Sequence, residues 1–217
     1  MKRTLFAATV LVLVLGFVLA ATMLREKRSA ELGALAEEQS TVFVRPHSPT
    51  LGDGDAKVVL VEFTDPACET CAAFSPLVKE LMERHPGKIR LVVRYAPFHQ
   101  GADEVARILE AARRQDRFWD TLDLLYRSQR TWTRHHQVIL DQVWVVLALG
   151  NLDIERLQAD LADPRHSEIL AQDLADAETL GVRKTPGFFV NGQPLEPFGA
   201  EPLIALVESA IRQQYPE

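Results

Sequence analysis

Cys68 and Cys71 are the only cysteines of the chain, and two residues separate them. The run 58–63 before them is apolar and rich in β-branched residues, which predicts a buried parallel strand. From Phe74 to Met82, apolar residues recur at helical spacing. Cys68 is therefore expected at a turn from strand to helix, where the helix N-terminus favours a thiolate. We predict that Cys68 is the attacking sulfur and that Cys71 resolves the mixed disulfide.

Two other roles for the cysteine pair, a structural disulfide and half of a metal site, fit the sequence less well. A disulfide across two residues closes too short a loop to constrain the unfolded chain much. A structural zinc site requires four ligands, and the chain has no further cysteine. His135 and His136 would point about 100° apart on a helix, and neither they nor His99 have an acidic partner at ligand spacing. We predict redox chemistry without a metal or an organic cofactor.

Two motifs together resemble the DsbA-like branch of the thioredoxin superfamily. The first surrounds the cysteines, with Glu62 six positions before Cys68 and Pro76 five positions after Cys71. The second is the segment 185–192, which begins Thr-Pro-Gly and lies more than a hundred residues downstream. The resemblance covers roughly residues 41–213. It implies an α/β thioredoxin fold with an inserted all-helical domain, and a protein thiol–disulfide oxidoreductase.

The resemblance also implies roles for three residues outside the cysteine pair. Glu62 would be a buried acid with a raised pKa that relays a proton to or from Cys71, although an odd polar residue in a strand can also face a solvated sheet edge. X–Pro bonds are cis in only about 5–6% of cases, but the family pattern favours cis at Pro186. That proline would leave the backbone of Thr185 free to pair with an extended substrate.

Glu69 and Thr70 stand between the cysteines, where many DsbA-like oxidants carry Pro-His. A carboxylate beside Cys68 opposes the thiolate charge by repulsion, while it also favours the N-terminus of the same helix. We expect a milder oxidant than DsbA, with a higher pKa at Cys68.

The first segment of the chain is expected to enter a membrane. Residues 4–24 carry no charge, and basic residues stand on both sides of them. An apolar helix of about twenty residues spans the roughly 30 Å hydrocarbon core. A cleaved signal usually has a shorter apolar region, so we predict an uncleaved anchor, with signal cleavage as the alternative. The family resemblance implies that the membrane is a bacterial inner membrane. Export to the periplasm suits dithiol chemistry.

The remaining pattern divides the chain around these features. Residues 41–44 are expected to form a first short strand, and 45–55 a loop. The predicted units are the anchor 1–24, a charged stalk 25–40, a first thioredoxin part 41–98, a helical insertion 99–181 and a second thioredoxin part 182–217. Further expected elements are strands 58–63, 88–95 and 187–190, helices 138–149, 153–161 and 167–180, a hairpin turn at 191–192 and a closing helix from 202 to 211.

These expectations predict a periplasmic enzyme that exchanges disulfides with protein substrates, in the oxidising direction, and is reoxidised by a membrane redox partner. The same residues would serve a reductase or an isomerase, because thiol exchange is symmetric. A module that binds Cu(I) or a peptide without catalysis is a further alternative, since thiolates suit Cu(I). The formal net charge of −6 argues against nucleic acid as a partner.

Overall fold

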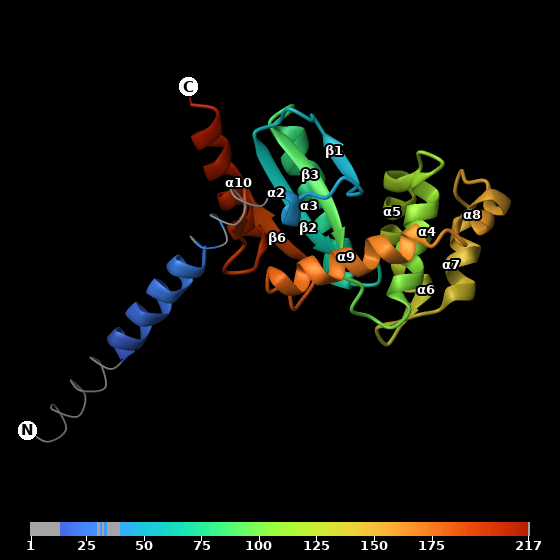
Figure 1. Cartoon of the computed structure of the whole chain (residues 1–217), viewed down its shortest axis with the longest axis horizontal. Helices are drawn as coiled ribbons and strands as arrows, with labels where there is room; N and C mark the ends of the chain where they lie inside the picture. The colour runs from blue at the N-terminus through green and yellow to red at the C-terminus, as the bar shows by residue number, and fades with distance from the viewer. Residues whose placement is uncertain (1–13, 30, 32, 34–39, 217) are drawn as a thin grey trace, which may run out of the picture.

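The computed structural model describes residues 14–29, 31, 33 and 40–216 (Figure 1). A five-stranded mixed sheet has the order β1-β3-β2-β6-β7. β2 and β3 run parallel, and the other neighbouring strands pair antiparallel. The predicted strands 58–63, 88–95 and 187–190 and the hairpin turn at 191–192 are confirmed. The strands are β1 (Thr50–Gly52), β2 (Val58–Thr64), β3 (Ile89–Tyr95), β6 (Gly187–Val190) and β7 (Gln193–Pro194).

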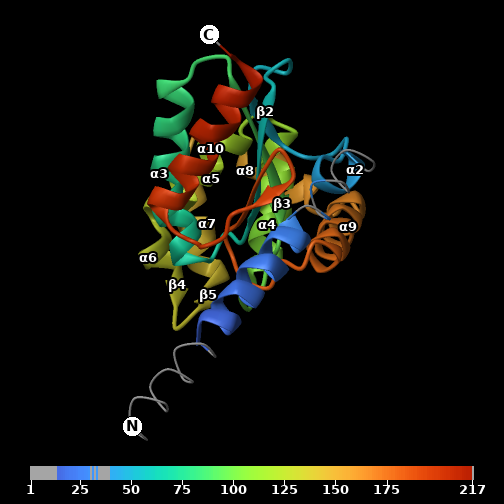
Figure 2. The ribbon, with the colours of Figure 1, turned by 90° about the vertical axis from the view of Figure 1, so that its left-hand side faces the viewer.

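Helices cover both faces of the sheet because successive side chains of β2 point to opposite sides. Val58 and Leu60 pack into a core with α3 and α10, which lie side by side (Figure 2). Val61 and Phe63 pack on the other face, under α2 and the end of α9. These helices are α2 (Ser40–Phe43), α3 (Glu69–Arg84), α9 (Arg165–Thr179) and α10 (Ala200–Gln214).

The predicted helical insertion lies at one end of the sheet, and α9 runs from it back across the sheet (Figure 1). The expected helices are present; those at 138–149 and 153–161 are shorter than expected, and the one expected at 167–180 begins two residues earlier, at Arg165. A small hairpin, β4–β5, stands before α7. The elements of the insertion before α9 are α4 (Ala102–Arg113), α5 (Phe118–Arg127), α6 (Gln129–Trp132), β4 (Thr133–Arg134), β5 (Gln137–Val138), α7 (Leu140–Leu147) and α8 (Ile154–Asp160).

The first strand was misplaced by sequence reasoning. Residues 41–44 belong mainly to the short helix α2, and the strand that pairs with β3 is β1, inside the expected loop 45–55. Val42 and Phe43 use their apolar side chains to cover the sheet face. Their carbonyls accept hydrogen bonds from Arg94 of β3 and not from a neighbouring strand. β-branched and aromatic residues here therefore indicate burial without strand pairing.

The prediction that His135 and His136 lie on a helix is also wrong. They form the tip of the β4–β5 hairpin, where both have a positive φ, 50° and 61°. The ring of His136 stacks on that of His99, with centroids 5.7 Å apart.

Residues 14–29 form a helix that extends away from the rest of the chain (Figure 1). In the parts of the chain that the structure describes, no helix is both long enough and apolar enough to cross a membrane. Residues 1–13 of the expected anchor and residues 30, 32 and 34–39 of the expected stalk lie outside the described residues.

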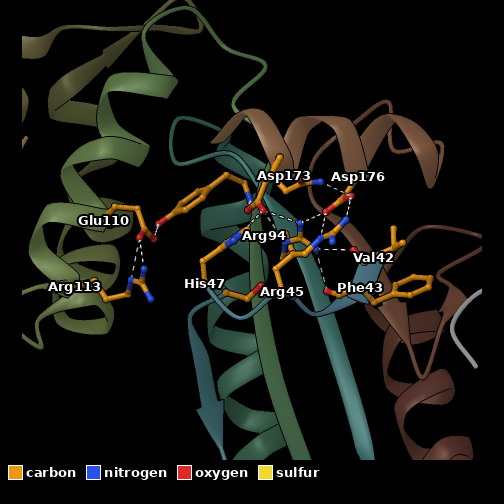
Figure 3. Close-up of polar contacts among 12 residues, drawn as sticks. Val42, Phe43, Arg45, His47, Arg94, Glu110, Arg113, Asp173 and Asp176 are labelled. Carbon is orange, nitrogen blue, oxygen red and sulfur yellow. Dashed lines mark hydrogen bonds and ion pairs between the residues drawn. The ribbon is translucent and has the colours of Figure 1, made fainter. Parts of the chain in front are cut away.

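A buried ion-pair cluster joins α9 to β3 (Figure 3). Arg94 has no exposed surface, and it donates to Asp173 through two nitrogens at 2.9 and 2.7 Å and to Asp176 at 2.5 Å. Arg45 and His47 approach the same two carboxylates from the segment after α2, at 2.6 and 2.7 Å. The cluster fixes this segment and α9 against the sheet.

Candidate active site

The two cysteines lie at the turn from β2 to α3, as the sequence predicts. Cys68 is the N-cap of α3, and its backbone N–H donates to the carbonyl of Asp65 at 3.0 Å. The Asp65 carboxylate accepts the backbone N–H of Ala67 at 2.8 Å, which tightens the turn. Both thiols are free; Cys68 keeps 5% of its surface exposed, and Cys71 keeps none. Of the two thiol-bearing residues, Cys68 is the one that reaches the surface.

The environment of Cys68 favours its thiolate. A hydrogen bond from the Cys71 thiol, helped by the Thr185 side chain and the backbone N–H groups of Cys71 and Thr70, lowers the pKa of Cys68 to about 5 despite partial burial. These donors come from the first turn of α3 and from the loop before β6. The helix N-terminus thus acts on Cys68 as the sequence predicts.

The pKa values of Cys71 and Glu62 are raised, whereas that of Cys68 is lowered. Burial, the hydrogen bond to Cys68 and the charge of Glu62 raise the pKa of Cys71 well above its usual value. Burial also raises the pKa of Glu62 to about 7, against a hydrogen bond from Thr64, and the Cys68 thiolate adds to the rise. Glu62 Oε1 has no hydrogen-bond partner among the described atoms, and Glu62 lines a cavity of about 140 Å³ with Tyr126. Glu62 is therefore a buried acid near the thiols, not a residue of a solvated edge.

The Thr185–Pro186 bond is cis, as the family resemblance implies. Cys68 Sγ lies 3.3 Å from the carbonyl oxygen of Thr185, so the loop before β6 closes over the nucleophile. In this contact the protonated Cys68 thiol donates and the Thr185 carbonyl accepts. The side chains of Glu69 and Thr70 are exposed on the first turn of α3.

The structure adds three residues that sequence reasoning did not assign to the site. Asp65 is fully buried and accepts the backbone N–H of His99 at 2.8 Å, while its carboxylate also lies 2.7 Å from His99 Nδ1. Gln129 of α6 donates to the turn from the other side. Asp65 stands within the cysteine motif, but no pattern in the sequence points to His99 or Gln129 as its neighbours.

The described residues offer no cluster of three or more His, Cys, Asp or Glu side chains that could hold a metal ion. The side chains gathered at the turn are the two thiols and the buried carboxyl groups of Glu62 and Asp65, beside the loop that carries Thr185 and Pro186.

A family model described as thioredoxin matches residues 45–209. The chain belongs to the thioredoxin family. The match includes both sequence motifs and the whole helical insertion. It confirms the fold expected from the resemblance.

Individual relatives agree with this assignment. A thioredoxin-like oxidoreductase from Silicibacter pomeroyi DSS-3 superposes with a TM-score of 0.69 at 29% identity, and the match covers 80% of this chain and 98% of that one. A probable disulfide bond formation protein D from Bacillus anthracis is 29% identical over 74% of this chain and 77% of its own length. These similarities support the predicted enzyme class, a thiol–disulfide oxidoreductase.

A longer relative is the Na(+)/H(+) antiporter NhaA of Herminiimonas arsenicoxydans, which is 35% identical over 162 residues. The aligned segment is 74% of this chain but 25% of the antiporter. The chain thus spans about a quarter of the length of the first curated relatives that it matches.

Proposed function

We propose that this thioredoxin-family protein exchanges disulfides with protein substrates, with Cys68 as the nucleophile and Cys71 as the resolving thiol. The observation that carries the proposal is the contrast within the pair: an acidic, slightly exposed Cys68 beside a fully buried Cys71 with a raised pKa. A thiolate at neutral pH is what nucleophilic attack on a disulfide requires.

In the oxidising direction, a substrate thiolate attacks Sγ of Cys68 in the Cys68–Cys71 disulfide. The S–S bond breaks, and Cys71 leaves as a buried thiolate. A second substrate thiolate then attacks the substrate sulfur of the mixed disulfide and releases Cys68 as a thiolate. The substrate loses two electrons and gains a disulfide, while the pair becomes a dithiol.

Glu62 is proposed to supply the proton that Cys71 needs on leaving. A buried thiolate at Cys71 is unfavourable, and the pKa of Glu62, raised by burial to about 7, lets its carboxyl hold a proton close to neutral pH. In the reverse direction the Glu62 carboxylate accepts the proton from Cys71.

The proposed direction is oxidation, because stabilising the Cys68 thiolate stabilises the reduced enzyme and makes its disulfide easier to reduce. We expect the Cys68 pKa of about 5 to lie above the about 3.5 of DsbA, which fits a milder oxidant. A reductase or isomerase would use the same residues with a lower potential.

We further propose that residues 4–24 anchor the enzyme in the inner membrane, that the catalytic domain faces the periplasm, and that a membrane partner reoxidises the pair. The uncharged N-terminal stretch supports this location. Fractionation of cells that express the full chain tests the anchor; recovery of an N-terminally shortened chain in the soluble periplasmic fraction would contradict it.

The test of the direction is the reduction potential of the pair, equilibrated against glutathione. A potential nearer about −120 mV than about −270 mV is expected, because those values belong to DsbA-type oxidants and thioredoxin-type reductants. Cys68→Ser is the control and should show no exchange. A potential near the lower value would contradict oxidation, and stoichiometric Cu(I) binding without exchange would favour the binding module.

A further inference from the structure

Gln129 makes a contact with the cysteine turn that the mechanism above does not use. Its side chain is buried at the start of α6, and Nε2 donates to the carbonyl oxygens of Pro66 and Cys68 at 2.9 and 3.1 Å. Both partners are acceptors, so the amide group must present its N–H groups and not its oxygen to the turn. A residue of the helical insertion thus holds two backbone carbonyls beside the nucleophile.

The oxygens of these two carbonyls are the negative ends of peptide dipoles, and they lie in the same turn as the Cys68 thiolate. The carbonyl of Cys68 also accepts the backbone N–H of Ala72, the first hydrogen bond of α3. The carbonyl of Pro66 has Gln129 as its partner. A side-chain N–H that binds both oxygens offsets part of their negative charge and fixes where they point.

We propose that Gln129 is a positioning residue through which the helical insertion holds the Cys68 turn and stabilises its thiolate. This inference rests on the proposed exchange function, and it assigns the insertion a role in the reactivity of the pair.

A second contact from the insertion supports the same conclusion. His99, which precedes α4, binds the carboxylate of Asp65 through its backbone N–H and its ring. Asp65 in turn accepts the N–H groups of Ala67 and Cys68. The turn is therefore held by His99 at its beginning and by Gln129 at its end, and both residues lie outside the two thioredoxin-fold parts of the chain.

The test replaces Gln129 by Met, which keeps the size and removes the donor, and by Glu, which keeps the shape and presents oxygen to two acceptors. The readouts are the pH dependence of Cys68 alkylation and the equilibrium constant with glutathione, measured on the full chain. We expect the alkylation midpoint to rise by about one pH unit. The equilibrium constant for substrate oxidation should fall about tenfold, which corresponds to about 30 mV.

Trp132→Phe is the matched control. Trp132 is buried in the same short helix, and its Nε1 donates to the carbonyl of Leu125, away from the cysteine turn. This variant loses a buried donor to a backbone carbonyl, as the Gln129 variants do. It should lower the melting temperature while the alkylation midpoint and the glutathione equilibrium stay at the parent values.

The proposal is overturned if folded Gln129→Met or Gln129→Glu protein keeps both readouts within twofold of the parent, or if Trp132→Phe shifts them equally. If one Gln129 variant does not fold, the other carries the test. If neither folds, alkylation of Gln129→Asn, which keeps the amide but shortens its reach, decides in the same way. Failure of the proposed function is separate, because it would appear as absent exchange in the parent protein.

Discussion

Two buried polar sites lie on opposite faces of the same strand pair and differ in how their charges are satisfied. In the register of β2 and β3, Phe63 pairs with Arg94, and the neighbouring Glu62 pairs with Val93. Arg94 is surrounded by carboxylates and carbonyls (Figure 3). Its guanidinium also lies over the Phe63 ring, 5.3 Å from the ring centroid. Glu62 has an oxygen without a partner and an apolar cross-strand neighbour.

This difference separates a structural site from a chemical one. A buried charge whose hydrogen-bond and ion-pair partners are all present keeps its ionisation state. Its removal leaves those partners as unpaired charges in the low-dielectric interior. A buried acid without a counter-charge has a raised pKa and can exchange a proton near neutral pH. The Arg94 cluster thus stabilises the fold, whereas Glu62 and the thiols can gain or lose protons.

The largest expected effect on stability comes from breaking the Arg94 cluster. Arg94→Met should lower the free energy of unfolding by about 3–5 kcal/mol, because it leaves Asp173 and Asp176 with fewer partners in a buried site. Denaturant unfolding measures the change. Arg90→Met on the same strand is the control, since Arg90 is partly exposed, and it should cost less than about 1 kcal/mol. Equal losses in the two variants would contradict a structural role that is specific to Arg94.

The next largest effect is a gain in stability, expected from a change at Glu62. Burial raises the pKa of Glu62 from 4.5 in the unfolded chain to about 7 in the folded one. The ionised carboxylate therefore destabilises the fold, with its full effect above about pH 7 and with no effect below about pH 4.5. Glu62→Gln should therefore stabilise the reduced protein by about 3 kcal/mol at about pH 8 and by nothing at about pH 4.

Unfolding of the Glu62→Gln variant at both pH values provides the measurement. Glu83→Gln, an exposed position of α3, should show no comparable change. A Glu62→Gln variant that is less stable than the parent at the higher pH would show that Glu62 has a charged partner there.

A smaller effect is expected from the thiol that donates to Cys68. Cys71→Ala should raise the pKa of Cys68 above about 5, by roughly 1–2 units, because it removes the largest cause of the shift. Cys71→Ser keeps a donor and should shift the pKa less. The pH dependence of alkylation by iodoacetamide gives both values; identical midpoints for the two variants would place the main stabilisation elsewhere.

The smallest effect concerns Glu69. Its side chain is exposed beside Cys68, so solvent screens its charge. Glu69→Gln should lower the pKa of Cys68 by only a few tenths of a unit, measured by the same alkylation profile. A fall of a full unit would show that this carboxylate has a larger influence on the Cys68 pKa than its exposure implies.

Local patterns predicted the parts of the site that are close in sequence. Periodicity predicts the strand 58–63 and the helix that follows it. The position of Cys68 at the N-terminus of that helix then follows from the sequence. The cis bond at Pro186 came from the family resemblance, because the residues alone favour trans. The sequence predicts only the direction of the pKa difference between Cys68 and Cys71, because its size depends on burial.

Contacts over long sequence separations were not predictable. Gln129 lies 63 and 61 residues from the carbonyls that it binds, and Asp173 lies 79 residues from Arg94. An arginine in a strand and a glutamine at a helix start are ordinary surface residues by pattern. The error at 41–44 has a related cause: Val42 and Phe43 cover a sheet face, and their apolar character shows burial without showing which backbone groups pair.

The most direct test of the account is a titration of thiolate ultraviolet absorbance against pH on the reduced full chain, with Cys71→Ser to assign the signal. The account predicts one thiol that ionises with a midpoint near pH 5, and a second that stays protonated past the usual cysteine range. A first midpoint near the free-cysteine pKa of about 8.5, or two thiols that ionise together, would contradict the claim that the site separates the pair into a nucleophile and a resolving thiol.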